Sequence, residues 1–488
     1  MGWLAHILGK QKDTAQKRTP QIFFTNTLSD NKELFIPQKP GLALMYTCGP
    51  TVYGPAHIGN LRSYVFSDSI ARILYAAGYQ VKRVINITDV GHLVSDGDEG
   101  EDKMTKGLRR EGLALTLKNM RSMAEKYAAI FLEDLTEMEV PTDKITFPCA
   151  SDYIPEQIAL IKTLEQKGYA YRTSAGIYFD TARFIGYGKL GGINLKDQQE
   201  GKRTKKNAEK RNPADFVLWK PEAKLGWESP WGLGFPGWHI ECSAMSRSLL
   251  GQELDIHTGG EDHIAVHHNN EIAQSEAASG RIFVHYWMHN AFLNMGKDKI
   301  SKSLGNVVYL SDIVEKGFHP LSLRYFFLQA HYRTPLSFSW DALAGAESAL
   351  ERLWNLSREI AQESGRKSAP GESRNRFLAT MRDDLATPQA LGILWDSLKS
   401  EEYTPEEKWG LLEDAEAHLG LLLTAPPALH TLSETDLPKE IREMLTQRET
   451  ARASMDFKEA DRIRDILEDR GYRVDDGPNG PVLTPTTL

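Results

Sequence analysis

The stretch from Leu42 to Asn60, LALMYTCGPTVYGPAHIGN, constrains the fold of this chain more than any other. The alternating apolar residues Leu42, Leu44 and Tyr46 indicate a buried strand, and the glycines and prolines that follow indicate a loop. After Asn60 the apolar residues recur at helical spacing. A strand, a loop and a helix start in this order are typical of an α/β sheet, in which ligands bind beyond the carboxyl ends of the strands.

Two polar side chains, His57 and Asn60, stand at the predicted start of that helix. The unpaired N–H groups and the positive dipole end of a helix N-terminus favour a bound phosphate. Side chains three positions apart leave the same face of a helix, so both could donate hydrogen bonds to phosphate oxygens during phosphoryl or adenylyl transfer. The alternative is a capped helix in which the histidine is incidental.

A second motif, KISKS at residues 299–303, favours the phosphate-binding interpretation of His57 over the incidental histidine. Together with HIGN at residues 57–60, it resembles HIGH and KMSKS, the two signature motifs of class I aminoacyl-tRNA synthetases. Asn60 replaces the last histidine with another hydrogen-bond donor, and Ile300 replaces methionine with an apolar residue of similar size. Four longer segments resemble the cysteinyl-tRNA synthetases: TCGPTVYGPAHIGN, NITDVGH, PGWHIECSAMS and HHNNEIAQSEA. The similarity runs from about Gln21 to the C-terminal GPNGPV.

The resemblance and the hydrophobic pattern together predict an α/β protein with a Rossmann-type nucleotide-binding fold and added domains. Strands are expected at residues 81–87 and 254–257, and amphipathic helices dominate after residue 340. We expect a tail at 1–20, the first half of the catalytic domain at 21–140, a connective insertion at 141–234, the second half with the KISKS loop at 235–339, an α-helical bundle on the anticodon-stem side at 340–430, and a small α/β anticodon-binding module at 431–488.

A helix predicted to begin near Asp262 carries His263, His267 and Glu271 at positions i, i+4 and i+8. This spacing puts three potential ligands on one helical stripe, although such a stripe is as often a solvated helix face. Zinc accepts thiolate, imidazole and carboxylate ligands together, so Cys48 and Cys242 make a zinc site chemically sensible.

The resemblance implies which residues form that site and which bind the amino acid. It implies that one zinc ion is held by Cys48, Cys242, His267 and Glu271. His263 stands where the family usually has a hydrophobic residue, so we expect it to orient a neighbour and not to bind the metal. The residues implied for the cysteine pocket are Thr88, Trp238, His257 and Asp262. Capping of the next turn by Thr88 and N-capping by Asp262 are the structural alternatives.

For ATP, the resemblance implies binding by His57, Gly59, Asn60 and Lys302, with magnesium accompanying the nucleotide. Lys299 and Lys302 would act in catalysis with His57 and Asn60, and Lys302 would neutralise charge on the reacting phosphates from a mobile loop. The substrate carboxylate itself attacks phosphorus in such a reaction, so a protein nucleophile is not required.

Composition limits the compartment and the partners only loosely. Three cysteines in 488 residues do not form a disulfide framework and fit a reducing cytoplasm. The sequence contains no apolar run long enough to span a membrane. A net charge of −8 is not typical of a nucleic-acid-binding protein. Two local basic stretches could nevertheless contact tRNA: residues 103–110 and 202–211.

We therefore predict a monomeric, cytoplasmic, zinc-dependent ligase that joins L-cysteine to tRNA(Cys) through a cysteinyl-adenylate, using ATP. One alternative is a cysteine ligase with a small amine as acceptor, although the long chain after Ser303 argues against it. The other is a non-catalytic zinc-binding relative, against which the intact His57, Lys299 and Lys302 argue.

Overall fold

The computed structural model describes residues 20–90, 103–192, 209–223, 225–296, 298–299, 307–428, 437–470, 472–477 and 480–485. Residues 1–19 of the predicted tail, Lys302 and most of the basic stretch at 202–211 lie outside these ranges. Among the described residues, no helix combines the length and the apolar character needed to cross a membrane.

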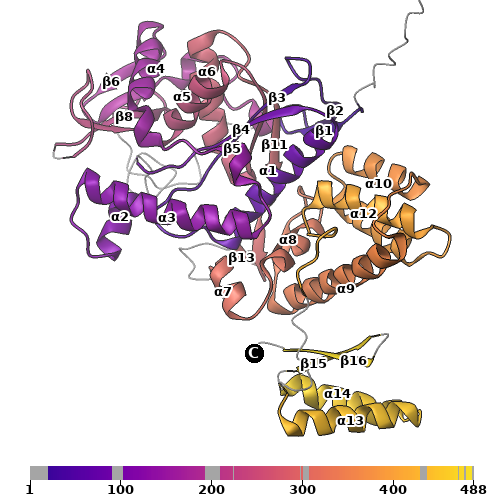
Figure 1. The fold of residues 1–488 in the computed structure, drawn as a ribbon. Coiled ribbons are helices and arrows are strands. Elements are labelled where there is room, and N and C mark those ends of the chain that lie inside the picture. The colour runs from indigo at the N-terminus through magenta and orange to yellow at the C-terminus, as the bar shows by residue number, and fades with distance from the viewer. Residues whose placement is uncertain are drawn as a thin grey trace, which may run out of the picture.

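A parallel five-stranded sheet in the order β11-β10-β3-β4-β5 forms the centre of the catalytic part (Figure 1). Its strands are β3 (Leu42–Thr47), β4 (Gln80–Ile85), β5 (Ile145–Thr146), β10 (Leu254–Gly260) and β11 (Val284–Asn290). The predicted strand at Leu42 is thus the middle strand of the sheet, and the predicted α/β class is confirmed. The sheet also continues past the boundary predicted at residue 140, because β5 pairs with β4.

Side chains of β3 alternate between the two faces of the sheet, as the pleat requires. Ala43 and Met45 join the core that contains helix α1 (Ile58–Ala76), which packs against β3, β4 and β10. Leu44, Tyr46 and then Cys48 join the opposite core, where helix α5 (Trp238–Leu250) packs with α6 (Asn269–Ser279) beside it. This alternation directs Cys48 toward α5 and away from α1.

One buried carboxylate, Asp68 of α1, ties the catalytic part to the helices that follow it. It pairs with Arg72 at 2.6 Å, with Arg83 of β4 at 3.1 Å and with Arg324 at 2.7 Å. Burial alone would raise the pKa of Asp68, but the three guanidinium groups hold it well below its usual value. Arg324 also donates to the carbonyl of Leu419, so the cluster spans distant parts of the chain.

The insertion folds as a separate antiparallel sheet in the order β6-β7-β8-β9, with helix α4 (Ile154–Gln166) beside it. Its strands are β6 (Ala170–Thr173), β7 (Gly176–Phe179), β8 (Phe216–Pro221) and β9 (Gly234–Pro236). Helix α4 also packs against α5, so the insertion rests on the face of the central sheet that carries Cys48. Two further helices precede it in the chain, α2 (Lys103–Arg110) and α3 (Leu117–Glu137).

The remaining elements belong to short sheets, the bundle and the C-terminal module (Figure 1). The short strands are β1 (Phe23–Asn26), β2 (Asn31–Leu34), β12 (Leu293–Met295), β13 (Asp298–Lys299) and β14 (Leu336–Phe338). The helices of this region are α7 (Leu310–Glu315), α8 (Pro320–Leu328), α9 (Trp340–Ser364), α10 (Glu372–Arg382), α11 (Thr387–Lys399) and α12 (Pro405–Leu419). The module contains α13 (Lys439–Ala453), α14 (Phe457–Asp469), β15 (Tyr472–Gly477) and β16 (Gly480–Pro485), packed around its own small core.

Candidate active site and metal centre

The floor of the site is a row of rings across three adjacent strands of the sheet, from the middle strand β3 to the edge strand β11. Strand register places His257 of β10 directly beside Tyr46 of β3 and Trp287 of β11. The ring centroids of His257 lie 5.1 Å from Tyr46 and 4.7 Å from Trp287. Since residues in register point to the same face of a sheet, these rings form a rigid platform under the polar residues above them.

Cys48 enters the site from the carboxyl end of β3, where its N–H donates to the carbonyl of Thr258 at 3.1 Å. The next residue is glycine because the chain passes directly against β4 there. A Cβ on Gly49 would overlap the carbonyl of Asn86. The N–H of Gly49 donates to the Asn86 side chain at 2.8 Å, which fixes this turn and the position of Cys48.

The segment that supplies the histidines is less regular than the helix predicted from Asp262. After β10 the chain forms a 3₁₀ turn at Glu261–His263, a π-helical turn at Ile264–His268 and then the α-helix α6. Single π-turns are rare in proteins, and those that occur are often found at functional sites. Here the π-turn brings the neighbouring side chains His267 and His268, both buried, into the same cluster.

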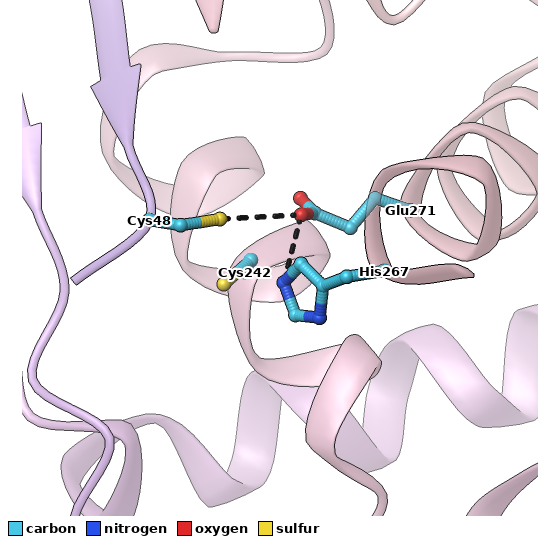
Figure 2. Close-up of side chains that lie close together, drawn as sticks. All are labelled: Cys48, Cys242, His267 and Glu271. Atoms are coloured by element: carbon cyan, nitrogen blue, oxygen red, sulfur yellow. Dashed lines mark hydrogen bonds and ion pairs between the residues drawn. The ribbon is translucent and has the colours of Figure 1, made fainter. Parts of the chain in front are cut away.

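Four side chains converge on one point: Cys48, Cys242, His267 and Glu271 (Figure 2). One potential ligand atom from each lies within 4.8 Å of the other three, and all four residues are buried. Glu271 Oε1 lies 3.0 Å from His267 Nε2 and 3.6 Å from Cys48 Sγ. The structure therefore brings together the four residues that the resemblance implied.

The electrostatics of this cluster favour a bound cation. The hydrogen bond from Cys48 lowers the pKa of Cys242 to about 6, whereas burial raises the pKa of Cys48 itself. Burial favours a neutral His267, but hydrogen bonds to Cys242 and Glu271 outweigh it and raise the pKa of His267 to about 10. Burial would also raise the pKa of Glu271, but His257 and His267 hold it low. A thiolate and a carboxylate that are buried together require a positive charge beside them, and a metal cation would supply it.

Three further histidines surround the cluster, and sequence reasoning missed them as functional candidates. His239 Nδ1 lies 2.9 Å from His267 Nδ1, and His268 Nε2 lies 3.2 Å from Cys48 Sγ. His289 Nε2 lies 2.7 Å from His268 Nδ1. His239 and His268 each stand directly beside a predicted site residue, Trp238 and His267, whereas His289 lies in β11, which carries none. The doublet HH at 267–268 was the signal available in the sequence.

The residues predicted for the cysteine pocket border the cluster in different ways. The half-buried ring of Trp238 lies 4.4 Å from the ring of His267, and His257 Nε2 lies 3.1 Å from Glu271 Oε2. Thr88 is buried, and its hydroxyl donates to Glu241 at 2.9 Å. The alternative, capping of the next turn, involves residues from about 91 onward, which lie outside the described residues. Asp262 is exposed, and the N-cap position of its 3₁₀ turn is occupied by Gly260 and not by Asp262.

His263 lies beside the cluster without belonging to either group of potential ligands found among the described residues. Its ring centroid is 5.1 Å from those of His267 and His268. Burial lowers the pKa of His263 to about 4, so its ring is neutral near pH 7. Its predicted role of orienting a neighbour stays a prediction.

The HIGN motif forms the start of α1. His57 is the N-cap residue, and its Nδ1 accepts a hydrogen bond from the Asn60 N–H at 3.3 Å. The Asn60 side chain accepts in return from the His57 N–H at 3.3 Å, which completes a capping box. Since Nδ1 accepts, the neutral His57 ring carries its proton on Nε2 and can donate from that nitrogen. The capped helix and the phosphate-binding interpretation are therefore compatible.

The KISKS motif begins in strand β13, which contains the backbone of Lys299, while Lys302 lies outside the described residues. The first described segment after the motif, which begins at residue 307, pairs with HIGN. The Ile58 N–H donates to the Val308 carbonyl at 2.9 Å, and His57 forms a β-bridge with Tyr309. The segment at Val308 and Tyr309 is thereby fixed at the helix start that carries His57.

Comparison with protein families gives two matches that cover different parts of the chain. Residues 34–348 match the model of the tRNA synthetases class I (C) catalytic domain. Residues 434–480 match the model of the cysteinyl-tRNA ligase anticodon binding domain. The chain is also similar to "Cysteine--tRNA ligase 1" of Burkholderia lata, with 45% identity over 94% of this chain and 96% of that protein. A second relative is "Cysteine--tRNA ligase" of Treponema denticola, with 41% identity over 92% and 97% of the two chains.

Solved structures support the fold. Methionyl-tRNA synthetase of Mycobacterium tuberculosis, in complex with methionyl-adenylate, aligns with a TM-score of 0.55. The alignment covers 78% of this chain and 90% of that one at 15% identity.

Proposed function

The chain belongs to the cysteinyl-tRNA synthetase family of class I and is a cysteine–tRNA ligase, and from this membership we propose how its residues carry out the reaction. In the proposed mechanism, cysteine and ATP first form cysteinyl-adenylate, and the acyl group then passes to tRNA(Cys). The observation that carries the proposal is the convergence of two thiols, an imidazole and a carboxylate at one buried point.

The donor set fits zinc, because zinc accepts sulfur, nitrogen and oxygen ligands in a four-coordinate site. Cys48, Cys242, His267 and Glu271 would hold the ion, and its charge would balance the buried thiolates and carboxylate. When bound, zinc would attract the sulfur of cysteine in preference to the hydroxyl of serine and lower the thiol pKa from about 8.5.

The other residues of the pocket would orient cysteine beside the metal centre. The partly exposed ring of Trp238 covers His267 on the side from which a substrate can approach. The exposed carboxylate of Asp262 is suited to the substrate ammonium, and His257 holds Glu271 in place from below. Thr88 stands at the carboxyl edge of the sheet, where its hydroxyl links the substrate pocket to Glu241.

Activation would take place at the start of α1. His57, Gly59 and Asn60 would bind the phosphates of ATP, which magnesium accompanies, with His57 donating from Nε2. Glycine at position 59 avoids crowding His57, since a Cβ there would lie 3.0 Å from His57 Nδ1. Lys302 would neutralise charge on the α-phosphate and pyrophosphate, with Lys299 in support. The bridge between His57 and Tyr309 supports this role, because it ties the segment that follows the KISKS motif to the phosphate site.

The match to an anticodon-binding domain at residues 434–480 favours tRNA as the acceptor over a small amine. The bundle at 340–430 and the module at 431–488 would grip the anticodon side of tRNA(Cys). The enzyme would act as a monomer in the cytoplasm, where tRNA, ATP and free cysteine are available.

The test is amino-acid-dependent ATP–pyrophosphate exchange, with zinc-edge X-ray absorption on the same sample. We expect exchange with cysteine and a rate with serine lower by more than about 10²-fold, the limit of a pocket that sorts near-isosteres by shape. The absorption spectrum should show one more sulfur neighbour when cysteine saturates the enzyme. A sample without zinc, or a zinc shell unchanged by cysteine, would refute the metal-based selection of cysteine.

A further inference from the structure

A second group of four metal donors overlaps the first: Cys48, His257, His268 and Glu271. One potential ligand atom from each lies within 4.8 Å of the others, and all four residues are buried. We propose that a divalent cation can occupy this second position, named here the inner position. The position formed with Cys242 and His267 is named the outer position. The inference rests on the proposed function, because both positions belong to the same metal centre.

Glu271 and Cys48 are placed to serve either position. The two oxygens of Glu271 face different histidines: Oε1 lies 3.0 Å from His267 Nε2, and Oε2 lies 3.1 Å from His257 Nε2. Cys48 Sγ lies 3.6 Å from Glu271 Oε1 and 3.2 Å from His268 Nε2. Metal–ligand bonds of about 2.0 to 2.3 Å place tetrahedral ligands about 3.3 to 3.8 Å apart. The separation between Cys48 and Glu271 falls in this range, and the other three are about 0.1 to 0.3 Å shorter than its lower limit, so an ion would require only small outward shifts of the histidines.

The ring of His268 is oriented as metal-binding imidazoles usually are, with its second nitrogen held by a partner. His268 Nδ1 lies 2.7 Å from His289 Nε2, and His289 Nδ1 lies 2.8 Å from the hydroxyl of Thr27. The hydrogen bond between His267 and His239 does the same for the outer position. Both neighbouring histidines are thus supported in the same way, with Nε2 directed to the cluster.

The two positions differ in chemistry and in depth. The outer position offers two sulfurs, one nitrogen and one carboxylate, whereas the inner position offers one sulfur, two nitrogens and one carboxylate. His257 and His268 are 0% exposed and rest on the ring platform of the sheet, whereas Trp238 covers the outer ligand His267. Trp238, which is proposed to line the cysteine pocket, packs on the outer ligand His267, and this favours the outer position as the one that meets cysteine.

One ion at a time is expected, because each position needs Cys48 and Glu271. The outer position is favoured while both thiols are available, since thiolates bind zinc strongly. If Cys242 is lost or oxidised, the inner position retains the ion inside the protein. With the outer ligand Cys242 gone, we expect the enzyme to keep its metal but to lose most cysteine activation.

The test uses the full chain loaded with Co²⁺, whose sulfur-to-metal absorption reports the number of thiolate ligands. Cys242→Ala and His267→Ala each remove one outer ligand and leave the inner set intact. Both variants should bind one Co²⁺ per chain, and Cys242→Ala should show about half of the wild-type sulfur-to-cobalt intensity. Adding His268→Ala to either variant should weaken Co²⁺ binding by at least about tenfold, the lower end of the loss for a disturbed metal shell.

His268→Ala alone is the matched control and should keep the two-thiolate spectrum, because the outer ligands remain. The inference is overturned if both outer variants fail to bind Co²⁺ while the wild type binds it. It is also overturned if the added His268→Ala leaves their affinity unchanged, or if the wild type binds two ions. A wild type that binds no metal would instead refute the proposed metal-based selection of cysteine. Circular dichroism of the metal-free variants checks folding, and either outer variant suffices if the other does not fold.

Discussion

At the scale of single residues, His57 combines two tasks on the two nitrogens of one ring. Nδ1 accepts from the Asn60 N–H and so caps α1. Nε2 is the nitrogen that can donate to a phosphate. A substitution that removes the ring therefore removes a helix cap and a proposed catalytic donor together, and the two losses must be separated by the choice of replacement.

We predict that His57→Ser separates them, because serine is a good N-cap residue but cannot reach the phosphates as imidazole does. The serine variant should unfold at nearly the wild-type temperature, while its pyrophosphate exchange falls about 10²-fold, as for loss of one charge-stabilising donor. His57→Ala should lose the same activity and in addition about 1 kcal/mol of stability. Exchange kinetics and thermal unfolding of both variants measure the two effects. Wild-type exchange in the serine variant would remove His57 from the mechanism.

The residues of the site divide into those that a sequence can identify and those that it cannot. Cys48, Cys242, His267 and Glu271 lie within motifs that resemble one family, so the resemblance identified them before the structure did. His239, His268 and His289 could not be assigned, because their contacts depend on strand register and on the path of a turn. The sequence around a histidine does not show which distant side chain the folded histidine will contact.

At the scale of elements, the stripe of His263, His267 and Glu271 shows the limit of a periodic pattern. The spacing predicted a regular helix from Asp262 with all three side chains on one face. The chain instead passes through a 3₁₀ turn and a π-turn before α6 begins, which brings His268 into the cluster and leaves His263 at its edge. Elements with long apolar periodicity, such as α1 and α9, were predicted well, because packing against a core requires that period.

Helix α3 contains an unfavourable group of acids near its carboxyl end: Glu133, Asp134 and Glu137. The partial negative charge of a helix C-terminus disfavours further negative charge there. Burial, with the neighbouring charges of Glu137 and Glu133, raises the pKa of Asp134 from 3.8 to about 7. The folded protein therefore resists the ionisation of Asp134, whereas the unfolded chain does not.

We predict that this carboxylate makes the protein less stable as the pH rises. Since the folded-state pKa lies above the unfolded one, stability is highest below about pH 4 for this group and falls between about pH 4 and pH 8. Asp134→Asn removes the titration and should stabilise the protein by about 1 kcal/mol at pH 8, allowing for partial exposure to solvent. Thermal unfolding of both proteins from pH 5 to pH 8 tests this. A difference that does not grow with pH would contradict the assignment.

At the scale of the whole molecule, the end of the bundle is tied back to helices α8 and α9 by its own backbone. The carbonyls of Leu419 and Leu421 accept hydrogen bonds from the buried side chains of Arg324 at 2.6 Å and Trp354 at 2.7 Å. The Leu423 carbonyl accepts another from Ser357. The C-terminal module, in contrast, has a core of its own. A truncation that removes the module without disturbing the bundle must therefore end after Leu423.

We predict that a chain ending at residue 428 keeps cysteine activation and loses most tRNA charging, because the module that meets the anticodon is removed. Pyrophosphate exchange should stay close to the full-length rate, while charging falls sharply. A chain ending at residue 418 is the matched control. It leaves the buried Arg324 without its acceptor at Leu419, so exchange should fail together with the fold. If the longer truncation remained folded but lost exchange as well as charging, the proposed division of labour would be wrong.

The buried cluster around Asp68 also has a consequence for how the protein is made. Arg72 and Arg83 follow Asp68 closely on the ribosome, but Arg324 is synthesised 256 residues later. At about 5 to 20 residues per second, that interval lasts roughly 13 to 50 seconds. During this time the nascent catalytic half carries a charge cluster that still lacks one partner. Its final packing is therefore postponed until α8 emerges, and the growing chain must stay unaggregated for that whole period.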